Sequence, residues 1–397
     1  MLSEQNNKKL KILLVLQTPW GTHLGMSRVH YELKLAYEAA GHQVDYLDGH
    51  MLYPKGNSLW QQITGLSTQE RILAYLKEHA HQYDVIDANQ RCIPYPKEDY
   101  GFKGIVLFRS HGLPPIYTLA ENQPYYKKML FDQPQQGRKA LKTKIGDVKR
   151  TLTQQEGEWA LWDSIRYADI VHTLNQKEYD YLKDYGIAED KLVFLPNGID
   201  AKYLEEAYTA MQEHQKLKKI TFLGSWTVRK GITHLPAIAK ALPQDYILQL
   251  LGTGNQEESI RAFIAMPDQK KLEIKTHFDL SDEIPLLKDT QWAIFPSYIE
   301  GMPLSIIEQI SLGIPVLAFD IPGVREVLSP IDDRLLIPVG DEETFIKRMN
   351  ELLSLSPEEY KELSQRCRRR AEDFNYKGVA QQFLDLYAEK LSKTSKL

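Results

Sequence analysis

The chain has 397 residues, of which 43% are hydrophobic and 10% aromatic, so it is longer than one hydrophobic core usually organises and two domains are expected. Its 49 basic and 53 acidic residues nearly balance, so the net charge gives no indication of nucleic-acid binding. The first apolar run, residues 12–16, is too short for a signal-peptide core, and the two cysteines, Cys92 and Cys367, show no metal-ligand spacing, so we expect a cytoplasmic protein.

Short apolar runs alternate with helical patterns in the first half of the chain. Residues 10–17 are rich in Ile, Val and Leu and predict a buried strand, and apolar residues recur at helical spacing over 29–40 until Gly41 stops the helix. A strand then resumes, which completes a βαβ unit. Strands are predicted at residues 44–47, 85–87, 104–109, 170–174 and 192–195.

The turn residues 196–198 are followed by residues 200–219, which look like a polar linker. The same alternation of strands and helices returns after this linker. Further strands are predicted at residues 220–224, 247–251, 272–275, 292–296 and 315–319, with helices at 234–241 and 303–312. A last helical pattern, 357–391, breaks near Asn375.

This order predicts an α/β protein with two Rossmann-like doubly wound domains that face a central cleft. We assign residues 1–200 to a first domain and 201–375 to a second domain. Residues 376–397 are assigned to a C-terminal helix that packs back on the first domain. A nucleotide would bind where the strands' carboxyl ends meet helix N-termini.

Residues 127–150 hold eight lysines and arginines but only two acidic residues, with aromatic residues close by. Such a run is predicted to be a solvated face, because charge runs usually are. The alternative is peripheral contact with a membrane, at its inner face, or with an anionic acceptor.

The most informative stretch is residues 295–308, where a strand, a loop with Glu300 and a helix that opens at Pro303 follow one another. The N–H groups of Met302, Leu304 and Ser305 could bind phosphate or sugar oxygens, and Gly301 allows a close approach. Glu300 and Glu308 could accept hydrogen bonds from the hydroxyls of a sugar nucleotide. The alternative makes Glu308 a solvated helix residue and Glu300 a capping anion.

A second stretch, residues 222–232, ends a strand at Gly224 and carries Arg229 and Lys230 before a helix. Departure of a diphosphate from a sugar places negative charge on the leaving group, and fixed cations stabilise it. The alternative is that these two cations are merely solvated.

Together these motifs resemble the family 4 retaining glycosyltransferases of GT-B fold, over nearly the whole chain. The resemblance rests on an ordered set of residues in the second half: Arg229, Lys230, Gly231, Gly252, Gly254, Pro296, Ser297, Glu300, Gly301, Pro303, Glu308, Gly313, Pro315, Val316, Gly323 and Glu326. In the first half, Asn197, Gly198 and Asp200 match the family's interdomain turn.

The resemblance implies that residues 1–200 form an acceptor-binding domain and residues 201–375 a domain for a nucleotide-sugar donor, and it gives each site a role. It places Glu308 on the ribose, Arg229 and Lys230 on the diphosphate, and Glu300 with residues 301–303 on the donor sugar. Gly224, Gly252 and Gly254 would line the nucleotide site, and Gly21 and Gly25 would form a loop near the phosphate and the acceptor. His111 resembles the family's active-site histidine near the sugar, although a lone histidine is also often structural.

The implied reaction is metal-independent hexosyl transfer with retention of configuration, without a cofactor and without nucleic acid as a partner. UDP-glucose is the expected donor and a glycan or glycolipid the expected acceptor, in polysaccharide biosynthesis. The family often has arginine where this chain has Ser225, so that phosphate contact would fall to Arg229. The alternatives are a non-catalytic sugar-nucleotide-binding protein, a sugar nucleotide epimerase, and an inverting transferase.

Overall fold

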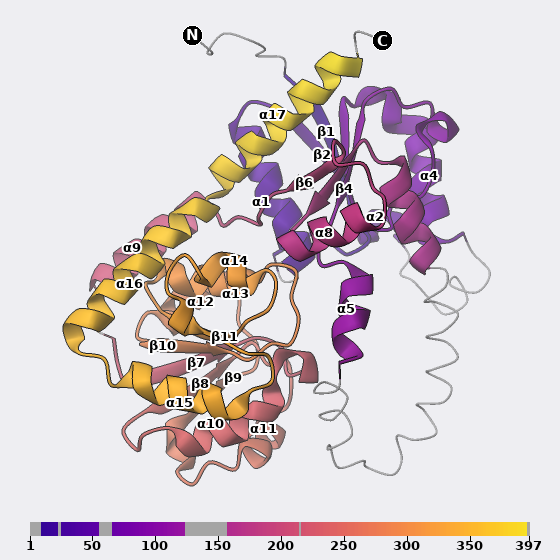
Figure 1. Cartoon of the computed structure of the whole chain (residues 1–397). Helices are drawn as coiled ribbons and strands as arrows, with labels where there is room; N and C mark the ends of the chain where they lie inside the picture. The colour runs from indigo at the N-terminus through magenta and orange to yellow at the C-terminus, as the bar shows by residue number, and fades with distance from the viewer. Residues whose placement is uncertain (1–8, 23–24, 55–65, 124–156, 214–215, 395–397) are drawn as a thin grey trace, which may run out of the picture. The chain divides into compact units, whose positions relative to one another are not determined.

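The computed structural model describes residues 9–22, 25–54, 66–123, 157–213 and 216–394. The chain divides into two compact units. Unit 1 comprises Met1–His111, Pro134–Leu195 and Tyr376–Leu397, and unit 2 comprises Gly112–Gln133 and Pro196–Asn375. Each unit holds a six-stranded sheet in which every described pairing is parallel, so the predicted α/β class with two doubly wound domains is confirmed (Figure 1).

The sheet of unit 1 has the strand order β2-β1-β3-β4-β5-β6. Its strands are β1 (Lys11–Val15), β2 (Gln43–Leu47), β3 (Val85–Asn89), β4 (Ile105–Arg109), β5 (Ile170–Thr173) and β6 (Leu192–Phe194), each at a predicted position. Its labelled helices are α1 (Gly25–Ala39), α2 (Gly49–Leu52), α4 (Thr68–His79), α8 (Gln176–Asp184) and α17 (Tyr376–Thr394). Residues 157–167 are also helical.

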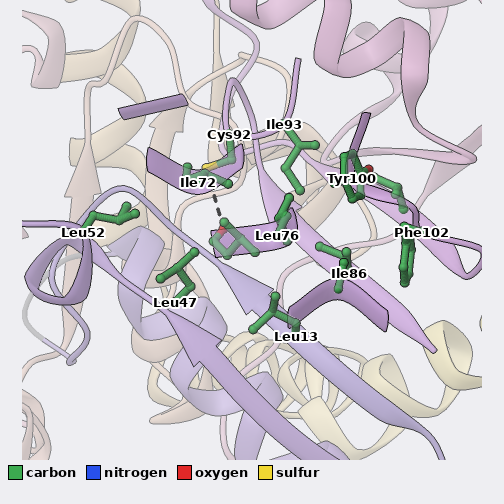
Figure 2. Close-up of a cluster of buried hydrophobic side chains, with 14 residues drawn as sticks. Leu13, Leu47, Leu52, Ile72, Leu76, Ile86, Cys92, Ile93, Tyr100 and Phe102 are labelled. Atoms are coloured by element: carbon green, nitrogen blue, oxygen red, sulfur yellow. Dashed lines mark hydrogen bonds between the residues drawn. The ribbon is translucent and has the colours of Figure 1, made fainter. Parts of the chain in front are cut away.

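Apolar side chains from both strands and helices fill one face of this sheet. Figure 2 shows Leu13 and Ile86 from the central strands close to Leu76 from α4, and all three are fully buried. The strands are apolar on both faces because helices cover both sides of a parallel sheet. This is why short runs of Ile, Val and Leu located the strands correctly.

A buried ion pair crosses the middle of the same sheet. The Arg109 guanidinium at the end of β4 donates two hydrogen bonds to Asp87 of β3, of 2.8 and 2.5 Å. Tyr387 of α17 donates a third to Asp87, of 3.0 Å, and the ring of Phe383 lies 4.3 Å from the guanidinium carbon. Burial would raise the pKa of Asp87, but Arg109 outweighs it, so the pKa is lowered. These contacts fix α17 on the sheet of unit 1.

The sheet of unit 2 has the order β12-β11-β10-β7-β8-β9. Its strands are β7 (Lys219–Leu223), β8 (Ile247–Leu251), β9 (Leu272–Lys275), β10 (Trp292–Phe295), β11 (Val316–Phe319) and β12 (Leu336–Ile337). Its helices are α5 (Pro114–Glu121), α9 (Ala201–Glu213), α10 (Leu235–Ala241), α11 (Glu257–Ile264), α12 (Leu280–Leu287), α13 (Leu304–Ser311), α14 (Val324–Leu328), α15 (Glu342–Leu353) and α16 (Pro357–Ala371). In Figure 1, α10, α11 and α15 lie on one side of this sheet and α9, α13 and α16 on the other.

Two expectations for unit 2 need correction. The segment after Asp200 is the helix α9, not a polar linker, because Tyr203, Leu204 and Ala207 form an apolar face that is buried. The edge strand β12 was not predicted, since two residues give no periodic signal. The predicted break near Asn375 is confirmed, because a 3₁₀ turn, Glu372–Phe374, separates α16 from α17.

The basic segment 127–150 lies outside the described residues, so the predictions made for it stay open. Over the part of the chain that is described, no helix has both the length and the apolar content needed to cross a membrane.

We predict that Asp87→Asn destabilises the protein by about 3–5 kcal/mol, because it leaves the buried Arg109 charge without an opposite charge. The matched control is Glu38→Gln, which removes an exposed ion pair with Lys34 on α1 and should cost less than about 0.5 kcal/mol. Urea unfolding followed by circular dichroism measures both. Equal effects of the two substitutions would contradict this role of the Asp87–Arg109 pair.

Candidate functional site

The candidate site begins where β7 and β10 end side by side. The two strands are hydrogen-bonded neighbours in parallel register, with Ile220 opposite Trp292. From β7 the chain continues into α10, and from β10 it continues into α13, on the other side of the sheet (Figure 1). Such a switch point leaves an opening at the carboxyl ends of the strands, and it is where doubly wound sheets bind their ligands.

Three predicted residues meet at this point, and we call them the Glu300 cluster: Glu300, Arg229 and Lys230. The Glu300 carboxylate is 2.8 Å from Arg229 Nη1 and 2.8 Å from Lys230 Nζ. Its side chain is 10% exposed, whereas those of Arg229 and Lys230 are 30% and 13% exposed. One carboxylate therefore holds two partly accessible cations, and the alternative of merely solvated cations is wrong.

The electrostatics of Glu300 follow from this pairing. Burial would raise the pKa of its carboxyl, but Lys230 and Arg229 outweigh burial and hold it below its ordinary value of 4.5. The carboxylate is therefore charged at neutral pH and neutralises only one of the two cations. The cluster keeps a net positive charge, which suits an anionic ligand.

The backbone joins the same two segments. Tyr298 N–H donates to the carbonyl of Arg229 at 2.9 Å, and Arg229 Nη1 donates to the carbonyl of Ile299 at 3.1 Å. Gly231 has φ +74°, and a Cβ there would lie 1.8 Å from the carbonyl oxygen of Pro296. Only glycine permits this approach between the turn after β7 and the loop after β10.

The loop that leads into α13 is also held from two sides. Asn197 Nδ2 donates to the carbonyl of Met302 at 3.2 Å, and a Cβ on Gly323 would lie 1.9 Å from the carbonyl oxygen of Gly301. The structure corrects one detail, because Pro303 is the N-cap and α13 begins at Leu304. The first turn of α13, with Leu304 and Ser305, thus starts next to the Glu300 cluster in sequence.

Glu308 lies in α13 and is 3% exposed, so the alternative of a solvated helix residue is wrong. Glu300 precedes the N-cap by three residues and pairs with two cations. It is therefore not the residue that caps the helix. The roles of both carboxylates toward a ligand stay predictions.

The glycines predicted for the nucleotide site follow two neighbouring strands. Gly224 directly follows β7, and Gly252 and Gly254 follow β8 with φ of +69° and +64°. Between them Thr253 is 2% exposed, and its hydroxyl has no hydrogen-bond partner among the described residues. The hydroxyl of Ser297, which is fully buried after β10, has none there either. Buried hydroxyls without a hydrogen-bond partner in the protein usually indicate a bound ligand or a water.

The remaining predicted residues lie in unit 1. His111 follows β4, and its Nε2 is hydrogen-bonded to Oδ1 of Asn89 at the end of β3. The ring of His30, from α1, lies 5.4 Å from that of His111. Burial, together with His30 and Arg109, lowers the pKa of His111 well below 6.5, so its imidazole is neutral. Gly21 precedes α1 and Gly25 is its first residue, so both belong to unit 1, whereas the Glu300 cluster belongs to unit 2.

Two neighbours of the Glu300 cluster carry no sequence motif. His234 and Tyr298 are both buried and are hydrogen-bonded to each other. They are 64 residues apart, and only the fold brings them together. Among the described residues, no group of three or more His, Cys, Asp or Glu is arranged to hold a metal ion.

Comparison with solved structures agrees that this is the GT-B fold. A sucrose-phosphate synthase from Thermosynechococcus elongatus matches 97% of this chain and 100% of its own, with a TM-score of 0.68 and 17% identity. HepE from Anabaena, solved with UDP and glucose, matches 96% of this chain and 100% of its own, with a TM-score of 0.66 and 13% identity. At these identities the likeness shows the fold alone.

Residues 205–373, most of unit 2, match the family model described as glycosyl transferases group 1. The resemblance of the sequence to glycosyltransferases of this group is thereby confirmed, while the assignment to family 4 stays a prediction. A mannosyltransferase of Mycolicibacterium hassiacum, named MMP alpha-(1->4)-mannosyltransferase, is 30% identical over 54% of this chain and 53% of its own. The chain thus spans about half the length of this curated relative.

We predict that Gly231→Ala disrupts the site, because its Cβ would clash with the carbonyl of Pro296. The matched control is Gly101→Ala, where φ is also positive, at +63°, but nothing lies within 4 Å of a Cβ. The control should cost about 1–2 kcal/mol for the left-handed backbone, and Gly231→Ala clearly more. Denaturant unfolding compares them, and equal costs would contradict the close approach.

A pH titration of stability tests the Glu300 cluster. Because the folded-state pKa of Glu300 is below 4.5, the stability it contributes is complete above the unfolded value and is lost as pH falls through the folded value. The difference in unfolding free energy between the wild type and Glu300→Gln should therefore be constant above about pH 5.5 and shrink below pH 4.5. A difference that does not change down to pH 3 would contradict the pairing.

Proposed function

We propose that the chain is a glycosyltransferase that moves a hexosyl group from a nucleoside diphosphate sugar to a glycan or glycolipid acceptor, with retention of configuration. One observation carries the proposal: the Glu300 cluster places two cations and one buried carboxylate at the switch point of the second sheet. A diphosphate is the ligand that such a net positive site at a βα switch point suits best.

The chemistry of the leaving group explains why two cations are needed. In the proposed step, the acceptor hydroxyl oxygen bonds to the anomeric carbon on the face from which the diphosphate departs. The bond from that carbon to the phosphate oxygen breaks, and the hydroxyl proton passes to a phosphate oxygen. Arg229 and Lys230 would stabilise the charge that develops on the diphosphate. Metal independence stays a prediction.

Glu300 has two tasks in this proposal. By pairing with both cations it holds them in place before the donor binds, so that little reorganisation is needed during the reaction. It would also accept hydrogen bonds from donor-sugar hydroxyls, with the backbone of Gly301, Met302 and Pro303. Glu308 would bind the ribose hydroxyls, and His111 of unit 1 would lie near the sugar.

The names of the relatives support the substrate class. The Mycolicibacterium hassiacum relative is a mannosyltransferase, and a further relative, 23% identical, is named a putative colanic acid biosynthesis glycosyltransferase of Salmonella typhimurium. The HepE structure holds UDP and glucose. We therefore keep UDP-glucose as the first donor to test, a surface polysaccharide or glycolipid as the acceptor class, and the cytoplasm as the expected location.

We predict that Lys230→Ala lowers kcat by about 10²–10³-fold, because one preorganised donor to the leaving group is lost. The readout is release of the nucleoside diphosphate from UDP-glucose, GDP-mannose and ADP-glucose in the presence of candidate acceptors. Lys240→Ala, an exposed lysine on α10, is the matched control and should leave kcat unchanged. Equal activity of Lys230→Ala and the wild type would remove Lys230 from the site.

We further predict that Glu308→Gln weakens binding of the nucleoside diphosphate by about tenfold, because a neutral amide replaces a charged acceptor of the ribose hydroxyls. Calorimetry against UDP, GDP and ADP measures it, with thermal unfolding as the check that the variant is folded. Binding without turnover on any acceptor would favour the non-catalytic alternative. If the folded wild type binds none of the three nucleotides, the proposed function is wrong.

A further inference from the structure

Three side chains form a hydrogen-bonded network next to the Glu300 cluster, and we call it the His234 network: Glu342, His234 and Tyr298. His234 Nδ1 lies 2.7 Å from a carboxylate oxygen of Glu342, and its Nε2 lies 2.6 Å from the Tyr298 hydroxyl. His234 and Tyr298 are each 2% exposed. Glu342, at the start of α15, reaches solvent with a 41% exposed side chain.

The direction of each hydrogen bond follows from the donor and acceptor types. A carboxylate only accepts, so Nδ1 of His234 carries the proton that Glu342 binds. Burial lowers the pKa of His234 although Glu342 opposes the shift, so the ring is neutral and its Nε2 is an acceptor. The Tyr298 hydroxyl therefore donates to Nε2. Each of the three groups has its partner, and the hydrogen bond to His234 holds the Tyr298 hydroxyl.

The aromatic surroundings restrict the same ring. Phe319 of β11 lies edge-on to His234 at 5.1 Å between ring centroids and 5.6 Å from the ring of Tyr298. Phe345 of α15 packs against Phe319, with 5.5 Å between the ring centroids. The hydrogen bond between His234 and Tyr298 is thus surrounded by apolar rings and is shielded from water, which makes its loss costly.

The His234 network and the Glu300 cluster join the same two segments of chain. His234 is four residues after Lys230 on the turn that follows β7, and Tyr298 is two residues before Glu300 on the loop that follows β10. The backbone N–H of Tyr298 donates to the carbonyl of Arg229 at 2.9 Å. Tyr298 is therefore held by its hydroxyl to one end of the turn and by its backbone to the other.

We propose that Tyr298 and His234, anchored by Glu342, are positioning residues that fix the loop carrying Glu300 against the turn carrying Arg229 and Lys230. In this proposal neither side chain touches the ligand. They set the separation at which one carboxylate can hold two cations, and thereby the separation of the cations from each other. The link to diphosphate binding rests on the proposed function, whereas the link to the geometry of the Glu300 cluster does not.

The first test is a double-mutant cycle on stability with Tyr298→Phe and Glu300→Gln. Tyr298→Phe keeps the ring and removes only the hydroxyl. Each single substitution changes the unfolding equilibrium constant by some factor. If the network positions the cluster, the factor for the double variant differs from the product of the two single factors by about threefold or more. Independent effects would overturn the positioning role, whatever the protein binds.

A matched control separates positioning from general stability. Tyr246 is 4% exposed and donates to Gln291 at 3.0 Å, and it immediately precedes β8, at the amino edge of the same sheet. Tyr246→Phe should lower stability to a similar extent and combine with Glu300→Gln without coupling. Coupling as large as that of Tyr298→Phe would overturn the proposal.

The second test asks whether the network acts on the diphosphate in particular. The calorimetric screen identifies which nucleoside diphosphate binds. The affinity for that diphosphate is then divided by the affinity for its nucleoside (UDP and uridine, GDP and guanosine, or ADP and adenosine), and this ratio is compared between variants. Tyr298→Phe should weaken diphosphate binding by about three- to thirtyfold while nucleoside binding stays within about twofold. An equal loss for both ligands would overturn the link to the diphosphate.

Rescue by a conservative change completes the test. His234→Gln can keep an amide near the position of Nε2, where it can accept from Tyr298, whereas His234→Leu cannot. We expect His234→Gln to retain more of the diphosphate-to-nucleoside ratio than His234→Leu at equal thermal stability. If the wild type binds no nucleotide, the proposed function fails, and the stability cycle still decides whether the network positions Glu300.

Discussion

The candidate site depends on one electrostatic arrangement, the pairing of the Glu300 carboxylate with Arg229 and Lys230. Glu300 lies 2.8 Å from each cation and offsets the repulsion between them, and the two cations offset the rise in the pKa of Glu300 that burial alone would cause. The pairing is possible because β7 and β10 are neighbours and end together. Gly231 then lets the following turn approach Pro296 closely enough. The strand order, Gly231 and Glu300 thus hold Arg229 and Lys230 together, and the two cations with one carboxylate give the site a net positive charge.

Unit 1 uses a buried ion pair differently. Asp87 and Arg109 satisfy each other inside the sheet, and Tyr387 completes the hydrogen bonding from the C-terminal helix. This pair has no exposed cation to offer a ligand, so we assign it to holding α17 on the sheet. The contrast with Glu300, which leaves Arg229 30% exposed, separates a structural ion pair from a candidate binding site.

Strand positions could be predicted because a buried parallel strand is apolar on both faces, and this signal is local. The Glu300 cluster could be predicted because its residues lie in two short motifs. In contrast, α9 was overlooked since its polar face dominates its composition and only Tyr203, Leu204 and a few alanines reveal the buried side. The His234 network could not be predicted, because His234, Tyr298 and Glu342 share no motif and meet only through strand order. Sequence patterns therefore indicated the residues of the site but not those that hold them.

The central claim is that the Glu300 cluster binds the diphosphate of a nucleotide. The most direct measurement is a crystal structure of the protein with UDP, or with GDP or ADP if one of these binds instead. The account predicts that the terminal phosphate lies within hydrogen-bond distance of Arg229 and Lys230, with the ribose hydroxyls at Glu308 and the base beside the loops that follow β7 and β8. A nucleotide bound elsewhere, with Arg229 and Lys230 still engaged only by Glu300, would contradict it.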